Sequence, residues 1–324
     1  MTDNDTTQKR RLGGTDLEVS PIGLGVMQFS GGKGMTGILF PDIPQKEKND
    51  IIKAALDGGI NWFDTAEMYG RGNSEQGLAK ALEAAEKEDE EVIVATKWFP
   101  IFRTAGNIGK TISNRIRYLN GYTIDLYMVH QPWGFSSPEA EMNAMADLVE
   151  QGKIRTVGVS NFSADQMQRA HKALEKRGLT LAVNQVQYSL LSREIETNGI
   201  LDSAKELGVT IVCWSPLARG VLAGKYHQNP DLIKEKRFAW RLMLGRKIEG
   251  SAQLVKALGE IAENYGATQA QVALNWLVNF HGDIVVAIPG ASKVNQAEES
   301  AGAMKFKLSD DEMAQLDQLS RDFR

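Results

Sequence analysis

The stretch TVGVSNFSADQMQRAHKALEKRGLTLAVNQVQY, residues 156–188, contains the repeating unit of this chain. Its two short apolar runs, residues 156–161 and 182–188, flank a segment whose amphipathic spacing predicts a helix. Ser163 is placed to cap the start of this helix, and Gly178 is placed to end it. Several of the apolar runs in the chain are apolar almost without alternation, which is typical of strands buried on two faces. The stretch therefore predicts a strand, a helix and a second, parallel strand.

The same unit recurs along the whole chain. Apolar runs of strand length occur at residues 19–25, 60–66, 92–98, 124–130, 156–161, 182–188, 210–216 and 284–290. Helical segments lie between them, and one of these has capping-box spacing at Asn73 and Gln76. Eight strands alternating with helices predict an α/β fold, a closed parallel (β/α)8 barrel, as one domain over residues 1–324.

The segment before the first run predicts an additional element. KRRLGGTDLEVS, residues 9–20, has strand-like ends and a turn signal at Gly13 and Gly14, so we expect an N-terminal β-hairpin there. Residues 1–8 are polar and are expected to be disordered.

A doubly wound open sheet is the alternative fold. Such a sheet binds a dinucleotide through a glycine-rich loop that leads from its first strand into a helix. GKGMTG, residues 32–37, has the Gly-x-Gly-x-x-Gly spacing, but Pro41 and Pro44 prevent a helix from beginning after it. We therefore interpret GKGMTG as a mobile glycine loop and favour the closed barrel.

Composition restricts the class of protein. The 324 residues are 42% hydrophobic and 24% charged with a formal net charge of -4, which is ordinary for a globular protein and argues against a nucleic-acid binder. The N-terminus lacks the apolar core of a signal peptide, and no apolar run is long enough to cross a bilayer, so we predict a cytoplasmic protein without membrane insertion. The single cysteine, Cys213, is expected to be a core thiol, and no metal site is predicted.

Polar side chains end the second, third and fourth predicted strands. These are Asp64, Lys97 and His130, and Tyr69 follows in the loop after Asp64. Each has a plainer interpretation: a helix cap formed by Asp64 with Glu67, a solvated lysine, a core histidine and a rim tyrosine. Active sites of (β/α)8 barrels lie at the carboxyl ends of the strands, so their coincidence at consecutive strand ends favours a shared site.

These four side chains suit proton delivery to a carbonyl oxygen while a hydride reaches its carbon. A phenol with an ordinary pKa near ~10 is a poor acid at neutral pH unless a nearby cation favours its anion. We expect Lys97 to lower the pKa of Tyr69 in this way. Asp64 would hold the lysine, and His130 would orient the carbonyl oxygen or share the proton relay.

On several motifs the chain resembles the aldo-keto reductases. The matching segments run in family order from about Arg11 to Leu319: FDTAEMYGRGNSEQGLAKAL (63–82), VIVATKW (92–98), IDLYMVHQP (124–132), GKIRTVGVSNF (152–162), NQVQYSLL (184–191) and SPLARGVLAGKY (215–226). The resemblance implies a TIM barrel and an NADPH-dependent carbonyl reduction, with NADH as the alternative cofactor. It also implies a catalytic tetrad of Asp64, Tyr69, Lys97 and His130.

The resemblance further implies where the cofactor contacts lie. Ser160, Asn161 and Gln185 would hold the nicotinamide carboxamide, and Trp214 would stack on the ring. The other implied contacts follow the first, seventh and eighth barrel strands: Gly25, Val26, Met27, Ser215, Leu217, Arg219, Gly220, Lys225, Gly290, Ser292, Lys293, Gln296 and Glu299.

The adenosine end departs from the family pattern. Many members have an arginine at the position of Gln296 and an asparagine at that of Ser300, so Lys293 is expected to hold most of the 2′-phosphate. The basic run at residues 232–247 is open to three interpretations: a flap over the pyrophosphate, a surface helix or a nucleic-acid patch, of which the surface helix is favoured.

The sequence therefore predicts an NADP(H)-dependent reductase of aldehydes and some ketones. The alternative is a dinucleotide-sensing subunit with slow chemistry, because the family resembled includes potassium-channel β subunits. We expect residues 28–46, Trp98 and Trp133 to shape the substrate pocket, and the short chain end to leave it open. The substrate itself and the oligomeric state are not predicted.

Overall fold

The computed structural model describes residues 8–32, 41–234, 245 and 247–324. Three expectations fall mostly outside this range: the disorder of residues 1–8, the GKGMTG loop and the basic run at 232–247.

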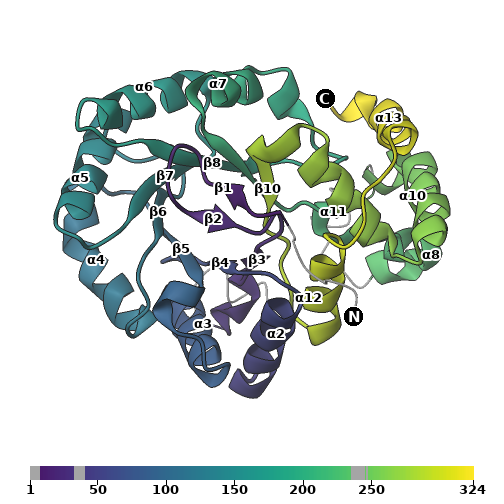
Figure 1. The fold of residues 1–324 in the computed structure, drawn as a ribbon, viewed down its shortest axis with the longest axis horizontal. Helices are drawn as coiled ribbons and strands as arrows, with labels where there is room; N and C mark the ends of the chain where they lie inside the picture. Colours follow the sequence, from purple (N-terminus) through teal and green to yellow (C-terminus); the bar gives the residue numbers. More distant parts are fainter. Residues whose placement is uncertain (1–7, 33–40, 235–244, 246) are drawn as a thin grey trace.

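Eight parallel strands form the barrel at the centre of Figure 1. They are β3 (Leu24–Gly25), β4 (Trp62–Asp64), β5 (Ile93–Trp98), β6 (Leu126–Val129), β7 (Thr156–Ser160), β8 (Leu181–Gln187), β9 (Thr210–Trp214) and β10 (Val285–Ala287). Seven of them lie within the apolar runs, β8 begins one residue before its run, and each strand pairs with the next along the chain. Gly23 N donates to Ala287 O at 2.8 Å and Gly25 N donates to Pro289 O at 2.9 Å, which joins the first strand to the last. The predicted closed barrel is thereby confirmed.

The predicted N-terminal hairpin is also confirmed. Strands β1 (Arg10–Arg11) and β2 (Glu18–Val19) pair antiparallel and lie over the centre of the barrel in Figure 1. Leu12, Leu17 and Val19 pack into the cluster that fills the barrel interior. Gly13 N donates to Thr210 Oγ1, at the beginning of β9, at 2.8 Å. The hairpin therefore closes the end of the barrel where the strands begin, and leaves the other end for a site.

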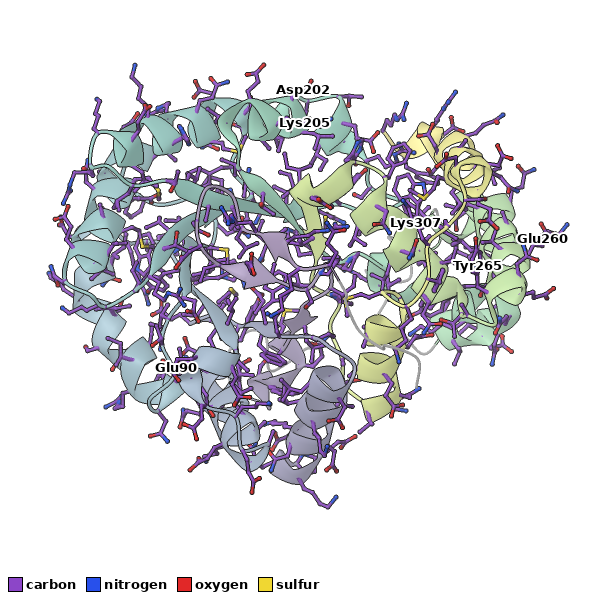
Figure 2. All side chains as sticks on the ribbon, in the orientation of Figure 1. Glu90, Asp202, Lys205, Glu260, Tyr265 and Lys307 are labelled. Carbon is purple, nitrogen blue, oxygen red and sulfur yellow. The ribbon has the colours of Figure 1, made fainter. Side chains whose placement is uncertain are left out.

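Helices surround the barrel and bury its outer face. They are α2 (Gln45–Asp57), α3 (Asn73–Ala84), α4 (Gly106–Leu119), α5 (Pro138–Glu150), α6 (Ala164–Glu175), α7 (Ile200–Leu207), α8 (Lys225–Gln228), α10 (Ala252–Tyr265), α11 (Gln269–Asn279), α12 (Val294–Gly302) and α13 (Asp310–Leu319). Their apolar stripes pack on the outward strand residues in one large cluster. Figure 2 shows charged side chains such as Asp202, Lys205 and Glu260 on the outside of this ring. Within the described part of the chain, no helix combines the length and apolarity needed to cross a bilayer.

The predicted helix boundaries agree with the structure at α6 but not at α3. Ser163 caps α6 in a capping box with Gln166, as predicted, and Gly178 adopts a φ of 69° three residues beyond the helix end. The predicted Asn73–Gln76 box is wrong, because α3 is preceded by Gly72 as its N-cap. Gly72 has a φ of 94°, and a Cβ there would meet the ring of Tyr118, so the chain turns into α3 at a position reserved for glycine.

Cys213 lies in β9 and is buried, as expected of a core thiol. Burial raises the pKa of this thiol well above its usual range, so it remains protonated and unreactive. Among the residues that the structure describes, no three His, Cys, Asp or Glu side chains are grouped as metal ligands would be.

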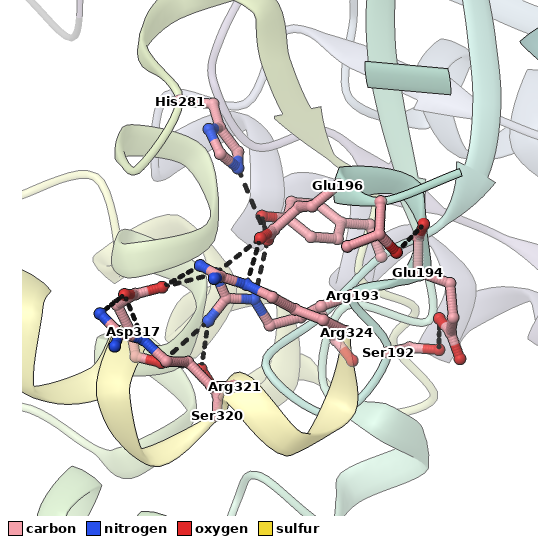
Figure 3. A network of polar contacts seen from close by, with 12 residues as sticks. Ser192, Arg193, Glu194, Glu196, His281, Asp317, Ser320, Arg321 and Arg324 are labelled. Carbon is pink, nitrogen blue, oxygen red and sulfur yellow. Dashed lines mark hydrogen bonds and ion pairs between the residues drawn. The ribbon is translucent and has the colours of Figure 1, made fainter. Parts of the chain in front are cut away.

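A network of ion pairs lies outside the barrel, between the loop after β8 and α13 (Figure 3). We call it the Arg193 network, and its members are Tyr188, Arg193, Glu196, His281, Asp317, Ser320, Arg321 and Arg324. Arg193 is fully buried and lies over the rings of Trp276 and Phe280 at 4.9 and 5.3 Å. This network joins α13 and the C-terminal residues to the loop after β8.

Candidate active site

Asp64 and Lys97 form a buried ion pair at the carboxyl ends of β4 and β5. Lys97 Nζ donates to Asp64 Oδ1 at 2.6 Å and to Thr65 O at 2.8 Å, and Gln185 Nε2 donates to Asp64 Oδ2 at 2.9 Å. Burial lowers the pKa of Lys97, against the opposing effect of Asp64 and Glu75. Asp64 therefore does not act as the helix cap considered above, and Lys97 is not a solvated strand end.

Tyr69 lies beside this pair, with Lys97 Nζ 5.2 Å from the centre of its ring. The loop that carries it is fixed by Ser74, whose N–H donates to Tyr69 O at 3.2 Å and whose hydroxyl donates to Val26 O at 2.7 Å. Tyr69 is only 9% exposed, and burial together with Asp64 raises its pKa. This direction is opposite to the lowering expected from Lys97, because burial and the negative charge of Asp64 both disfavour the phenolate. In this state Tyr69 is a neutral phenol, the form that can donate a proton.

His130 follows β6 and completes the group. Its ring meets the Tyr69 ring edge-on, with centres 5.6 Å apart and planes at 82°. Burial and Lys97 lower the pKa of His130 well below its usual range, so the imidazole is neutral. Its Nδ1 is buried and has no hydrogen-bond partner among the residues that the structure describes. In the same described part of the chain, the other three histidines also have a buried ring nitrogen without a hydrogen-bond partner, so it is the contact with the Tyr69 ring that associates His130 with the site.

Four of the predicted cofactor contacts form a hydrogen-bonded cluster next to Asp64. Ser160 Oγ donates to Gln185 O at 2.9 Å, and Asn161 Nδ2 donates to Ser160 Oγ at 3.0 Å. Trp214 Nε1 donates to Asn161 Oδ1 at 3.0 Å, which fixes the partly exposed indole at the end of β9. Asn161 has a φ of 61°, a conformation that needs support from such contacts. The structure thus brings the ends of β7, β8 and β9 together around Asp64.

The other predicted contacts lie at the same end of the barrel without all touching one another. Gly25, Val26 and Met27 follow β3; Ser215, Leu217, Arg219, Gly220 and Lys225 follow β9; Gly290, Ser292, Lys293, Gln296 and Glu299 follow β10. Lys225 lies against Gly220, where an added Cβ would be 2.9 Å from its Nζ. Gln296 Oε1 accepts from Ser292 N at 2.8 Å, so it holds the turn that begins α12. Lys293 is the N-cap of α12, and that helix begins at Val294 as predicted.

These residues fit a nicotinamide dinucleotide. The cluster at Asn161 offers amide and hydroxyl groups beside an indole face, and Arg219, Lys225 and Lys293 supply positive charge at the same end of the barrel. His130 has a buried ring nitrogen without a partner among the described residues, and its ring meets the Tyr69 ring edge-on. The donor set therefore suits a cofactor held across the strand ends, without a glycine-rich loop opening a helix.

The expectation that Trp98 shapes the pocket is wrong. Trp98 is fully buried and its Nε1 donates to Asn107 Oδ1, on α4, at 3.1 Å. Side chains alternate along a strand, so with Lys97 facing the barrel interior its neighbour faces the helices. Trp133 is 61% exposed in the loop after β6, as a rim residue would be.

Sequence reasoning missed other side chains close to the site. Phe102 and Phe135 are 83% and 68% exposed, with ring centres 6.2 Å apart. Glu75 and Arg115 are buried behind β5. The helical periodicity of the sequence could have indicated both residues. Glu75 lies among the buried positions of α3, and Arg115 follows Ile108 and Ile112 along the buried face of α4.

Comparisons with known proteins give a consistent result. A family model described as the aldo/keto reductase family matches residues 21–321. The chloroplastic pyridoxal reductase of Arabidopsis thaliana is 32% identical over 327 residues, which cover 97% of this chain and 86% of that protein. The glycerol dehydrogenase of Gluconobacter oxydans is 27% identical with a TM-score of 0.78, covering 98% of this chain and 97% of its own. An aldo-keto reductase from Klebsiella pneumoniae in complex with NADPH is 26% identical with a TM-score of 0.73, covering 97% and 96%.

Proposed function

The chain belongs to the aldo/keto reductase family and is an oxidoreductase, and on that premise we propose that it reduces aldehydes and some ketones to alcohols with NADPH. The observation that carries this proposal is the buried Asp64–Lys97 pair beside Tyr69 and His130. A proton donor, a cation and a neutral imidazole converge there at the strand ends, where barrel enzymes hold their substrates.

Each of the four side chains has a separate task. Tyr69 donates its phenolic proton to the carbonyl oxygen, and the charge of Lys97 then stabilises the phenolate that remains. Asp64 and Thr65 keep Lys97 in place, and the neutral ring of His130 donates a hydrogen bond that orients the carbonyl. NADPH, when bound, supplies the hydride to the carbonyl carbon. Tyr69 recovers its proton from solvent.

The chain's own residues favour NADPH over NADH. Lys293 precedes the first turn of α12, and a helix N-terminus attracts a phosphate group. Gln296 occupies the position of the usual arginine and is engaged by Ser292, so Lys293 is the principal cation for a 2′-phosphate.

The test is the rate of NADPH or NADH consumption with an aromatic aldehyde, in the wild type and in Tyr69→Phe. Phenylalanine keeps the ring and removes the proton, so we expect turnover to fall by about 10² to 10⁴-fold. The dissociation constant of NADPH, measured by fluorescence, should not change. A mutant rate close to that of the wild type would refute the role of Tyr69. Tight NADPH binding by a wild-type protein that shows no turnover would favour a sensing subunit.

A further inference from the structure

A second group of charged side chains lies behind the active site, on the outer face of β5. Lys97 faces the barrel interior, and the preceding residue, Thr96, faces α3. Thr96 Oγ1 donates to Glu75 Oε1 at 2.7 Å, and Glu75 is fully buried in the first turn of α3. A carboxyl group without solvent access is costly unless it is paired or protonated, so its retention needs a reason.

Arg115 connects this carboxyl group to the loop of Tyr69. Its Nε lies 2.9 Å from Glu75 Oε2, and its Nη1 lies 3.3 Å from Glu67 Oε1. We call Glu67, Glu75 and Arg115 the buried triad. The Arg115 contacts are close but not aligned as hydrogen bonds, so the attraction between the triad members is chiefly electrostatic.

Glu67 stands two residues before Tyr69 and is bonded to the end of β5. Its N–H donates to Lys97 O at 3.1 Å, and its carboxylate accepts from Phe99 N at 3.1 Å and from Arg103 Nη1 at 2.9 Å. On the inner face, Lys97 Nζ donates to Thr65 O. The loop that carries the proton donor is therefore tied to the strand that carries the lysine on both faces.

We propose that the buried triad is a positioning device for the reduction: Glu75, held by Thr96 and Arg115, places negative charge behind Lys97 and keeps Lys97 and Tyr69 in their reactive arrangement. Glu75 acts through Lys97, so it is a positioning residue. The proposal rests on the reductase function proposed above.

The electrostatics give this device a pH dependence. Burial raises the pKa of Glu75 to about 7, against the opposing effects of Arg115, Thr96 and Lys97. The charged and titratable groups near Glu75 are Arg115 on α4, Glu67 in the loop after β4, Lys97 on β5 and Tyr127 on β6. Those near Lys97 are Asp64, Tyr69, Glu75 and His130. As the pH rises through 7, Glu75 ionises and the negative charge behind Lys97 increases. That charge favours the cationic form of Lys97.

The experiment compares the wild type with Glu75→Gln across the pH range. Glutamine resembles the protonated glutamate, so the two proteins should reduce an aromatic aldehyde at similar first-turnover rates below about pH 6. Above about pH 8 the wild type should be faster by about tenfold, because only it gains the charge. NADPH affinity, measured by fluorescence, should match throughout.

Asp125→Asn is the matched control. Asp125 is a buried carboxyl group near the opposite end of β5, where it accepts from Val94 N at 2.8 Å and pairs with Arg155 at 2.8 Å. Burial raises its pKa to about 6. We expect this variant to lose stability and to keep its turnover at every pH.

A rate ratio between wild type and Glu75→Gln that is the same at every pH would overturn the proposal, because a structural defect alone has no reason to follow the charge of Glu75. If Glu75→Gln does not fold, Thr96→Val removes only the hydroxyl that holds Glu75, and the ratio of the wild-type rate to the Thr96→Val rate should rise with pH, as for Glu75→Gln. Wild-type protein that consumes no NADPH with any carbonyl compound would instead refute the proposed function, which separates the two failures.

Discussion

The Arg193 network and the active site both contain buried ion pairs, but the two groups differ in how completely their polar atoms are hydrogen-bonded. In the Arg193 network every nitrogen of the guanidinium is bonded: Nε to Glu196 at 2.7 Å, Nη2 to Glu196 at 2.8 Å and to Asp317 at 2.6 Å, and Nη1 to Ser320 at 2.6 Å. In the active site, the buried Nδ1 of His130 has no partner within the described part of the chain. The Lys97 ammonium has two acceptors, Asp64 and Thr65.

This difference in hydrogen bonding indicates which group stabilises the fold and which group is available for a reaction. A guanidinium whose nitrogens are all bonded has no donor left for a ligand, so the contacts of Arg193 can only hold the structure. A buried group left unsatisfied destabilises the folded state, and such groups concentrate where a substrate completes the bonding. The complete bonding of the Arg193 guanidinium, compared with the incomplete bonding of Lys97 and His130 to described residues, therefore distinguishes the two groups better than burial or charge does.

The largest effect on stability should come from Arg193→Met. The substitution leaves Glu196 and Asp317 without their buried partner, and breaking such a pair costs about 3–5 kcal/mol of unfolding free energy. Urea unfolding at neutral pH measures this loss. The remaining folded protein should reduce an aldehyde at the wild-type rate. A large fall in turnover, with little change in stability, would break the comparison.

Asp64→Asn should show the reverse pattern. Asparagine still accepts from Lys97, but the charge that holds the lysine is lost, at about 1.5–3 kcal/mol on the reaction barrier. Turnover should fall by about ten- to a hundredfold. Stability should change less than in Arg193→Met, because burial already lowers the pKa of Lys97 and eases its neutralisation. Steady-state rates and urea unfolding of the same preparation check both statements.

A smaller effect concerns the pH dependence of the unfolding free energy, which should have opposite signs for the Arg193 network and for Glu75. Burial alone would raise the pKa values of Glu196 and Asp317, but their hydrogen bonds, including those from Arg193, outweigh it and lower both. Their stabilisation is thus present above the ordinary carboxyl pKa of about 4 and is lost as the pH falls through the lowered values.

The raised pKa of Glu75 has the opposite sign. The folded state binds more protons than the unfolded one between about pH 4.5 and 7, so this contribution declines as the pH rises through that window. Urea unfolding at several pH values should show that Asp317→Asn reduces the acid-side loss, whereas Glu75→Gln reduces the decline toward neutrality. The same response from both variants would contradict the assignment.

The sequence predicted those features that depend on local pattern. Eight apolar runs predicted eight strands, and the strand-end rule brought Asp64, Lys97 and His130 to one place. Trp98 was misplaced, because one residue along a strand reverses the direction of a side chain. The buried triad was missed because its members come from two helices and a loop, so that only their positions on apolar stripes indicated them. Arg193 and Asp317 are separated by 124 residues, and no local pattern links them.

The hairpin at the beginning of the chain has a kinetic consequence. Its side chains fill the end of the barrel where the strands start, so molecules can reach Lys97 and Tyr69 only from the opposite end. Cofactor, substrate and the proton that restores Tyr69 would then share one route. Whatever binds deepest in that route would arrive first and leave last, so a hairpin at the opposite end of the barrel would set the order of binding and release.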